Sequence, residues 1–361
     1  MPTFEFSAIR RRLLRWYDRH RRDLPWRKTR DPYALWIAES MLQQTQVNTV
    51  VPYYRDFLKA FPSLRALDRA PREKVLALWS GLGYYRRAEN LKRAARIIVR
   101  NHQGSMPQEF NALRALPGIG DYTAGALASI AFNRPHPALD GNARRVLRRL
   151  FHAQKETALN ELARKLISRS RPGEFNQALM DLGSQVCLPR QPNCFACPCR
   201  RLCQAHLSGS YHLHGRRPAT QSVEIIWPLA IILRNGRILL RRRANTGLLA
   251  RLWEIPGGEK MPDEAPREAL QRQLRSVQGV GKVTRPAGEV RHSITRYKIR
   301  SPLFVCSMST DALAPGAGWR WVSLASLKRY PLSSLSMKAV KLVTGGLGGA
   351  GKARPARVFW R

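Results

Sequence analysis

The sequence has few acidic residues and no long apolar run. Among 361 residues, 24 Asp and Glu stand against 63 Lys and Arg, which gives a formal net charge of +39. A chain with this excess is attracted to polyanions, and nucleic acid is the first candidate. An acidic membrane surface is the second, but no stretch of about 18 apolar residues exists, which excludes a spanning helix. We therefore expect no membrane partner.

The N-terminus lacks a basic start followed by an apolar segment. We therefore expect no secretory signal and a cytoplasmic protein. Hydrophobic residues make up 44% of the chain, which is enough for one or two folded cores. The length corresponds to about two domains.

Cysteine is scarce outside one segment, where five of the six Cys lie within 17 residues. The spacing Cys187-x6-Cys194-x2-Cys197-x5-Cys203 suits four thiolate ligands of an iron–sulfur cluster or a structural zinc ion. The x6 and x5 spacings depart from paired zinc knuckles and favour a [4Fe–4S] cluster, with zinc or unliganded thiols as alternatives. Cys199 is interpreted as a bystander, because using it would shorten the last spacing to x3.

The pattern of apolar residues changes along the chain. It predicts a helical domain over residues 1–205, a linker over 206–221, a smaller α+β domain over 222–343 and a basic, Gly-rich tail over 344–361. The helices predicted in the first domain run from Pro32 to about Val47, Pro71 to Trp79, Ala88 to Val99, Leu113 to Leu116, Thr123 to Ala131, Asn142 to Phe151 and Ala158 to Ile167. In the second domain, strands are predicted over Ser222–Leu233, Arg237–Arg241, Tyr297–Cys306 and Trp319–Val322, with a helix over 263–277.

Two local signals in this pattern are specific. Asp31 precedes Pro32 as a helix N-cap before a proline at the first helical position. Asn235-Gly236 predicts a tight hairpin turn between two strands.

A Gly-x-Gly turn lies between two predicted helices in Leu116-Pro117-Gly118-Ile119-Gly120. Glycines let another backbone approach closely, and the N–H groups that open the next helix attract an anion. In so basic a chain this predicts a clamp on DNA phosphates. The alternative is an ordinary helix–helix turn.

Two carboxylates stand in settings suited to different protonation states. Glu39 is a lone acid inside an apolar helix, where burial raises a carboxyl pKa. Asp140 falls near the start of the helix at Asn142, where the helix dipole favours an anion. One protonated and one ionised acid are what cleavage of an N-glycosidic bond needs. Either residue could equally be a cap or a satisfied buried acid.

Several of these stretches together resemble one family. Residues 39–47 (Glu-Ser-Met-Leu-Gln-Gln-Thr-Gln-Val), residues 81–88, the Leu-Pro-Gly-Ile-Gly turn, Asp140-Gly141-Asn142 and the cysteine spacing are similar to the MutY-type adenine DNA glycosylases of the helix-hairpin-helix, endonuclease III superfamily. The resemblance runs through about residues 25–205 and more loosely to about 340. It implies a helix-hairpin-helix glycosylase fold, a [4Fe–4S] cluster and association with the nucleoid. A monomer is the simpler expectation for action on a single lesion.

The resemblance also implies an activity. It is removal of adenine mispaired with 8-oxoguanine or guanine in double-stranded DNA, as part of base excision repair. The target base is flipped out of the stack. Glu39 protonates the departing purine, Asp140 stabilises the sugar cation, and Tyr122 orients Asp140 or the intermediate.

Further residues of the site follow from the same motifs. Gln44 and Tyr84 would enter the gap beside the flipped base. The implied DNA-binding residues are Gln43, Gln44, Tyr84, Arg87, Leu116, Gly118, Gly120, Thr295 and Arg296. The implied cluster ligands are Cys187, Cys194, Cys197 and Cys203.

One position separates the branches of this superfamily. Bifunctional glycosylase/lyases carry a Lys just after the hairpin, whose amine forms a Schiff base with the sugar. Tyr122 occupies that place here, and no Lys lies between Lys92 and Lys155. A phenol cannot form an imine, so a monofunctional hydrolase is expected.

The second domain resembles the Nudix-like C-terminal domain of the same family. Gly258-x5-Glu264-x7-Arg272 follows the frame of a Nudix box, but Gln273, Ser276 and Val277 stand where the pyrophosphatase pattern needs Glu. Those acids hold the magnesium ions, so no nucleotide hydrolysis is expected.

In the family this domain checks the opposite base with a Phe-Ser-His loop. The counterpart here is Ile294-Thr295-Arg296, after His292, with Arg296 in place of the His. Lesion recognition is therefore implied with altered residues.

Two other functions compete with this interpretation. One is an endonuclease III-like pyrimidine glycosylase and abasic-site lyase, which borohydride trapping would reveal. The other is a non-catalytic iron–sulfur DNA-binding protein, from which no free adenine would be released. A nucleotide pyrophosphatase is opposed by the missing acids.

Overall fold

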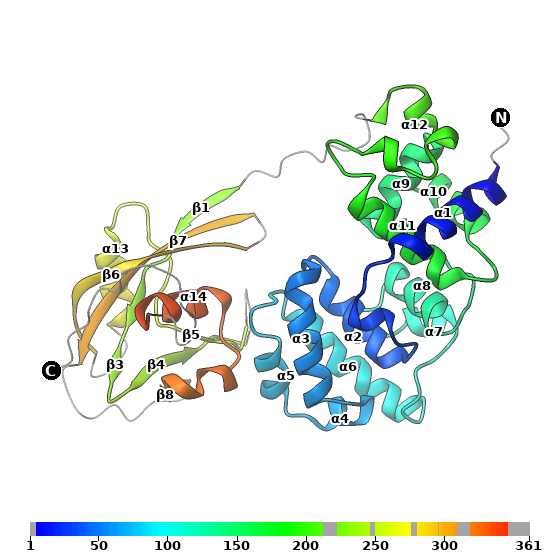
Figure 1. Cartoon of the computed structure of the whole chain (residues 1–361). Helices are drawn as coiled ribbons and strands as arrows, with labels where there is room; N and C mark the ends of the chain where they lie inside the picture. Colours follow the sequence, from blue (N-terminus) through cyan, green and yellow to red (C-terminus); the bar gives the residue numbers. More distant parts are fainter. Residues whose placement is uncertain are drawn as a thin grey trace. The chain divides into compact units, whose positions relative to one another are not determined.

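The computed structural model describes residues 5–211, 222–245, 250–275, 280–294, 296–308 and 318–345. The chain forms two compact units, Met1–Ala70 with Arg86–Pro218 and Pro71–Tyr85 with Ala219–Arg361. The first is helical, whereas the second contains the β-sheets (Figure 1). None of the described helices combines the length and apolarity that a bilayer-spanning segment requires.

The first unit is built from helices and short 3-10 turns. They are α1 Phe6–His20, η1 Pro25–Arg27, α2 Pro32–Leu42, α3 Val47–Ala60, α4 Leu64–Arg69, α6 Arg86–Asn101, α7 Phe110–Arg114, α8 Asp121–Ile130, α9 Gly141–Phe151, α10 Glu156–Leu166, α11 Pro172–Gln185, η2 Cys194–Ala196, η3 Arg200–Leu202 and α12 Gln204–Leu207. The predicted helices are present with shifted ends. Among the helices of this unit that were not predicted are α1, α3, α4, α11 and α12.

Helix α2 begins as its cap signal predicts. The Asp31 carboxylate accepts hydrogen bonds from the N–H groups of Tyr33 and Ala34. The predicted extension to about Val47 is wrong, because α2 ends at Leu42 and a separate helix, α3, starts at Val47. The chain turns at Gln44, whose φ of 59° lies in the left-handed region and interrupts the helical hydrogen bonds.

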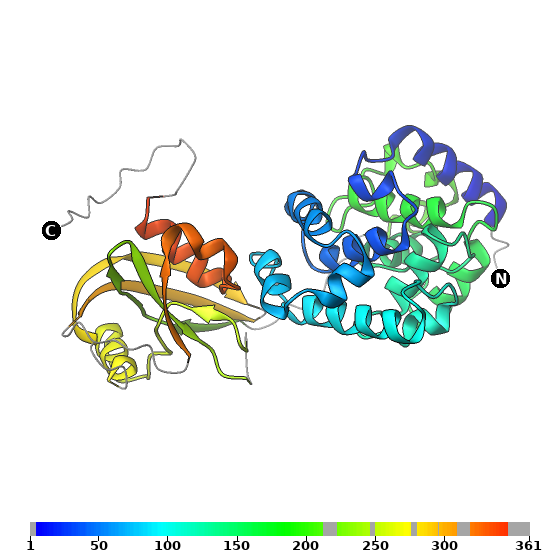
Figure 2. The same ribbon diagram turned by 90° about the horizontal axis from the view of Figure 1, so that it is seen from below.

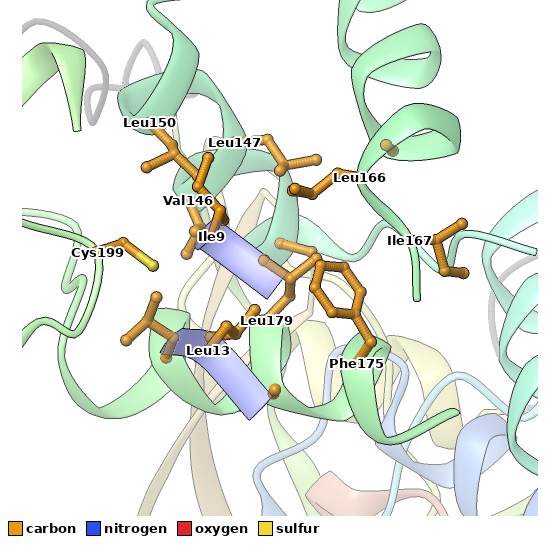
Figure 3. Close-up of a cluster of buried hydrophobic side chains, with 14 of the residues drawn as sticks. Ile9, Leu13, Val146, Leu147, Leu150, Leu166, Ile167, Phe175, Leu179 and Cys199 are labelled. Carbon is orange, nitrogen blue, oxygen red and sulfur yellow. The ribbon is translucent and has the colours of Figure 1, made fainter. Parts of the chain in front are cut away.

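An apolar core holds the C-terminal half of the first unit together. Side chains of α1, α9, α10 and α11 meet in it (Figure 3). Ile9 and Leu13 lie one turn apart on one face of α1, and they pack with Phe175 and Leu179 of α11. Cys199 projects into the same core. Because α9 and α11 are packed together here, the residues at their ends are held in fixed relation.

The described residues of the second unit form two four-stranded sheets. Its elements are α5 Arg72–Leu78, β1 Val223–Ile226, β2 Leu229–Ile231, β3 Leu233–Arg234, β4 Arg237–Arg242, β5 Trp253–Glu254, α13 Pro266–Leu274, β6 Val280–Ile294, β7 Tyr297–Met308, β8 Trp319–Ser323, η5 Leu324–Arg329 and α14 Ser334–Val343. In one sheet β7 pairs with β6 on one edge and with β1 and β2 on the other; in the second, β4 pairs with β3, β5 and β8.

The single strand predicted over Ser222–Leu233 is divided into β1, β2 and β3. Strands β1 and β2 keep one register against β7, from Val223 opposite Tyr297 to Ile231 opposite Val305. They are separated at Pro228, which has no N–H to donate to a sheet. The predicted hairpin at Asn235-Gly236 is confirmed, with φ values of 47° and 68° that a type I′ turn requires.

Both faces of β2 are buried, and a helix covers each face. Alternate residues of β2 and its end belong to different cores: Leu229 and Ile231 pack with α14, and Ala230 and Ile232 pack with α13. Figure 2 shows α13 and α14 on opposite sides of the strands. This explains the nearly continuous apolar run, since a strand covered on both sides needs no polar face.

Residues 71–85 belong to the second unit, although they lie within the sequence of the helical part. The hydroxyls of Ser80 and Tyr85 both donate to the Leu332 carbonyl, at 2.8 and 2.6 Å. Glu73 of α5 forms an ion pair with Arg242 of β4 at 2.9 Å. The chain therefore passes between the units at 70/71, at 85/86 and again at 218/219.

Candidate active site

Glu39, Tyr122 and Asp140 line one cavity of about 530 Å³ in the first unit. They come from the middle of α2, the first turn of α8 and the N-cap of α9. The three residues are far apart in sequence, and the packing of the helices brings them together. The cavity wall also contains Arg27 and Gln43.

The Glu39 side chain is buried among apolar residues of α2. Burial raises the pKa of its carboxyl to about 7, and the negative charge of Asp140 acts in the same direction. A hydrogen bond from Tyr122 and the positive charge of Arg27 oppose the rise. A carboxyl with this pKa can hold a proton near neutral pH and release it to a reacting group.

Tyr122 donates a hydrogen bond from its hydroxyl to Glu39 Oε2 at 2.6 Å. Burial raises the pKa of this phenol well above its usual range, so the hydroxyl keeps its proton. Tyr122 therefore orients Glu39. Because residue 122 is Tyr and not Lys, its side chain offers no amino group to the cavity.

Asp140 is the N-cap of α9. Its Oδ1 accepts from the Ala143 N–H at 2.7 Å, and its Oδ2 accepts from Asn142 Nδ2 at 3.0 Å. These two hydrogen bonds fix the Asp140 side chain at the start of α9. This leaves the cavity with an acid that can be protonated and an anion fixed in place.

Asn142, which donates a hydrogen bond to Asp140, is itself held by Arg145. Arg145 donates to Asn142 Oδ1 at 2.9 Å, to the Gly183 carbonyl at 2.6 Å and to the Cys187 carbonyl at 2.8 Å. The orientation of Asn142, and through it of Asp140, is thereby tied to the start of the cysteine segment.

Arg27 and Asp181 are site residues that sequence reasoning missed. The Asp181 carboxylate is fully buried in α11 and accepts from Arg27 Nη1 at 2.5 Å and from Arg22 Nε at 2.7 Å. This buried charge is compensated by the two guanidinium groups. It keeps Arg27 at the cavity wall, where Arg27 lowers the pKa of Glu39. No local signal could reveal a pairing between residues about 155 positions apart.

Arg87 extends into the protein, toward the C-terminal end of α2. Its Nη1 donates to the carbonyls of Ser40, Met41 and Gln43 at 3.0, 2.8 and 2.5 Å. These are the carbonyls that a helix end leaves without partners. Arg87 therefore fixes the turn that carries Gln43, which lines the cavity, and Gln44.

The Gly-x-Gly turn joins α7 to α8. Gly118 has a φ of 81°, and a Cβ at this position would lie 2.7 Å from Asn90 Cβ. Gly120 is the N-cap of α8, is exposed, and has open space where a Cβ would be. The side chain of Leu116 is buried, so only its backbone can face a ligand. The turn thus places an exposed glycine at the start of α8.

The clustered cysteines form no disulfide, and five of them line a small cavity of about 30 Å³. Arg149 Nη1 donates to Cys187 Sγ at 3.4 Å. Cys199 is a buried member of the apolar core, whereas Cys187, Cys197 and Cys203 contact that core from half-buried positions. Within the described ranges, no three His, Cys, Asp or Glu side chains form a site for a single metal ion.

The donor set suits an iron–sulfur cluster. Thiolates are the ligands of these clusters, and a guanidinium beside them offsets negative charge. The four thiols of the predicted spacing line one cavity; Cys199 lines it too, but is in addition a buried member of the apolar core. The residues present therefore fit the group.

Three predicted DNA-binding residues belong to the second unit. Tyr84 is about half exposed and has a φ of 47°. Arg296 is exposed and lies over the Tyr297 ring at 5.3 Å. Thr295 falls outside the described residues.

The Nudix-like frame has lost part of its acidic character. The Gln273 side chain covers Gly258, where a Cβ would come within 2.3 Å of it. Glu264, which the frame retains, accepts hydrogen bonds from Arg272 at both of its carboxylate oxygens. Ser276 and Val277 fall outside the described residues.

Comparisons with known proteins cover both units. Residues 37–172 match the family of HhH-GPD superfamily base excision DNA repair proteins, and residues 229–342 match the NUDIX domain family. The chain is 34% identical to an adenine DNA glycosylase of Homo sapiens, over 94% of this chain and 75% of that protein. It is 38% identical to an adenine DNA glycosylase of Buchnera aphidicola, over 68% of this chain and 72% of that protein.

Solved structures match somewhat more than half of the chain. A thermostable thymine-DNA glycosylase aligns with a TM-score of 0.54 and 31% identity, covering 56% of this chain and 97% of its own. Endonuclease III trapped covalently on DNA aligns with a TM-score of 0.50 over 57% of this chain and 99% of its own. At 21% identity this second likeness shows the fold alone.

Proposed function

The chain belongs to the adenine DNA glycosylase family, and on that premise we propose that it removes adenine opposite 8-oxoguanine or guanine in duplex DNA. It is a DNA glycosylase of base excision repair. The observation that carries the proposal is the single cavity in which the buried Glu39 and the N-cap anion Asp140 stand together.

The proposed reaction is hydrolysis of the bond between the purine nitrogen and C1′ of the sugar. The bond's electron pair leaves with the purine, and the Glu39 carboxyl supplies the proton that neutralises it. Asp140 stabilises the positive charge that develops at C1′, or bonds to C1′ transiently. Water then adds to C1′ and gives its proton to the Glu39 carboxylate. The products are free adenine and an abasic site.

Tyr122 makes this a monofunctional enzyme in the proposal. The Tyr122 hydroxyl is hydrogen-bonded to Glu39, and a tyrosine side chain contains no amine that could form an imine. Borohydride should therefore trap no covalent adduct with DNA. A trapped adduct in good yield would instead indicate an endonuclease III-like lyase.

The turn at Gly118 and Gly120 is the proposed phosphate clamp. Two other exposed residues, Gln44 and Tyr84, are proposed to enter the stack beside the flipped base. Both hold a left-handed backbone conformation that non-glycine residues rarely adopt, with φ values of 59° and 47°. Such strain is often retained at functional positions, which supports the assignment. Arg87 is proposed to act by holding the turn at Gln43 and Gln44 in place, and not by contacting DNA itself.

The second domain is proposed to recognise the base opposite adenine. The support is the NUDIX family match together with the exposed Arg296, in the loop that would replace the family's Phe-Ser-His. Thr295 is proposed to contribute its hydroxyl. The Thr295→Ala variant then loses preference for 8-oxoguanine over guanine; an unchanged preference would move recognition elsewhere.

Cys187, Cys194, Cys197 and Cys203 are proposed to hold a [4Fe–4S] cluster. When bound, the cluster would cross-link the segment 187–203 and keep it in one conformation. Arg145 and Arg149 attach this segment to α9 through the Cys187 carbonyl and thiol.

One assay tests the function. Duplexes carrying adenine opposite 8-oxoguanine, guanine or cytosine are incubated with the protein, and alkali then breaks the strand at any abasic site. We expect scission with the first two, and none with Glu39→Gln, whose binding to the same duplex stays within about tenfold. If Glu39→Gln also lost binding, Glu39 would be structural rather than catalytic.

A further inference from the structure

Helix α1 of the first unit presents a face of exposed arginines to solvent. We call the four exposed arginines of this helix the α1 arginine stripe; they are Arg11, Arg12, Arg15 and Arg19. With 3.6 residues per turn, these four positions fall within about 100° of the helix circumference. The other side of α1 is apolar, and Ile9 and Leu13 pack from it into the core (Figure 3). The arginines therefore share one face of the helix.

No acidic side chain within the described residues neutralises the stripe by contact. Its four side chains form no ion pair and no hydrogen bond with the described part of the chain. Asp18 is the single acidic residue of α1, and Arg171 donates to both of its carboxylate oxygens, at 2.5 and 3.2 Å. The exposed Arg96 of α6, by contrast, pairs with Asp68 at 3.4 Å. The stripe thus keeps four positive charges for a partner outside these residues.

The spacing of these charges suits a duplex backbone. Arg11 and Arg19 are eight positions apart, which is about 12 Å along a helix axis. Duplex DNA carries about seven phosphate charges over the same length, since its two strands together have one per about 1.7 Å. A guanidinium stays ionised and can donate two parallel hydrogen bonds to one phosphate. A small anion could not contact all four arginines at once, whereas a row of phosphates can.

Helix α1 ends beside the active-site cavity. Its last residue is His20, and Arg22, two positions later, lines the cavity that contains Glu39. An ion pair with Asp181 at 2.6 Å holds Arg22 there. A duplex with one nucleotide in this cavity would have neighbouring phosphates near the last turn of α1, where Arg19 lies.

We propose that the α1 arginine stripe binds the phosphate backbone of the duplex that flanks the target nucleotide. The inference rests on the proposed function, because it takes the duplex in the active-site cavity as the occupant of the stripe. Contacts to phosphates carry no sequence information directly. The stripe therefore adds affinity for duplex DNA with or without a mismatch, and does not select the base that is removed.

Salt-dependent binding of the full chain to duplex DNA tests the stripe. The stripe variant changes its four arginines to Gln. The matched control removes four charges from exposed positions of α3 and α6 in the same unit: Arg55→Gln, Lys59→Gln, Arg93→Gln and Arg100→Gln. Each phosphate contact contributes about 0.9 to the slope of log affinity against log salt concentration, so the stripe variant should flatten this slope by about 2 to 4 and bind at least about tenfold more weakly.

The control variant has the same net charge as the stripe variant. It should change the slope by less than about 1, because its four charges lie on two other helices and contact no phosphate in the proposal. Equal changes in the two variants would show that net charge alone sets the affinity, and would overturn the proposal.

Uncharged phosphates locate the contact. A duplex with methylphosphonates in the helical turn on each side of the mismatch should bind the unaltered protein more weakly than the unmodified duplex does. The stripe variant should lose less affinity from the same modification, by at least about fivefold, because it has already lost the partner of these phosphates. Losses that simply multiply would show that the stripe does not contact the flanking phosphates.

A third variant guards against loss of folding. Lysine at all four stripe positions keeps the charges and should restore most of the salt slope, whereas a folded lysine variant that binds like the glutamine variant would contradict an ionic contact. The proposed function fails separately: a chain that binds duplexes through the stripe but releases no adenine refutes the function alone. Release of adenine together with equal binding by the stripe and control variants refutes the stripe alone.

Discussion

Glu39 owes its chemistry to its surroundings rather than to its residue type. An exposed glutamic acid is ionised at neutral pH, whereas burial and the Asp140 charge bring the pKa of Glu39 to about 7. Tyr122 moderates this rise, since the bond it donates favours the ionised form. The protonated fraction of the proposed acid is therefore set by two neighbours that can be varied separately.

The pH dependence of excision follows from this balance. Below pH 7 the Glu39 carboxyl is protonated and can act as an acid; above it the proton is lost, and the rate should fall by about tenfold per pH unit. Tyr122→Phe removes the bond that lowers the pKa of Glu39, so the alkaline limb should move to higher pH. Single-turnover rates between pH 5 and 9 measure both effects. An alkaline limb that stays in place in Tyr122→Phe would mean that Glu39 is not the group that titrates.

Residue types predict part of this site. Glu39 stands out in the sequence because it is alone in an apolar helix, and Asp140 because it precedes a helix. The link between Tyr122 and Glu39 could not be predicted from residue type, since it depends on how α2 and α8 pack. Nor could the Asp181 pair with Arg27, because an aspartate inside an amphipathic helix looks like any solvated residue.

At the scale of elements, local sequence signals predict two features of the fold. The cap at Asp31 and the turn at Asn235-Gly236 have local physical causes, and both are confirmed. The end of α2 at Leu42 depends on Arg87, which is 45 residues away from it and replaces the missing helical hydrogen bonds. Local sequence therefore predicts where this helix begins but not where it ends.

The two glycines of the turn should separate folding from DNA binding. Gly118→Ala places a Cβ at a φ of 81° and against Asn90, so the free energy of unfolding should fall by about 2 kcal/mol or more. Gly120→Ala meets open space at an N-cap and should cost less than about 1 kcal/mol. It should nevertheless weaken duplex binding, because its methyl group stands where a phosphate would approach. Urea unfolding and titration with a duplex measure the two properties; Gly120→Ala with full affinity would argue against the clamp.

The cysteine segment offers a similar matched pair. Cys194→Ser should lose iron, since it removes a proposed ligand. Cys199→Ala should keep about four iron atoms and four sulfides per chain, because Cys199 is packed into the apolar core, and should instead lose stability. Iron and acid-labile sulfide analysis decides between them. Loss of iron from Cys199→Ala would show that the ligand set is wrong.

At the scale of the whole molecule, composition alone indicates the kind of partner. A net charge of +39 predicts attraction to a polyanion and says nothing of which bond is cut. The division between a helical part and a part with sheets is also visible in the apolar pattern. The membership of residues 71–85 in the second unit is not, because α5 is locally an ordinary helix and the hydrogen bonds that Ser80 and Tyr85 donate to the Leu332 carbonyl span about 250 residues.

Because residues 71–85 belong to the second unit, a segment from within the helical part of the sequence completes the fold of the C-terminal part. If a protease site is engineered into residues 212–221 and cleaved, the resulting fragments should co-elute under native conditions, because the N-terminal fragment still donates a helix to its partner's fold. Size-exclusion chromatography after cleavage measures this, and Tyr85→Phe with Ser80→Ala should let more of the cut protein come apart. Fragments that separate freely without these substitutions would show that the borrowed helix adds little cohesion. The covalent link within residues 212–221 is then not what holds the fragments together: the C-terminal fragment alone would lack residues 71–85, and only the N-terminal fragment could supply this segment of its fold.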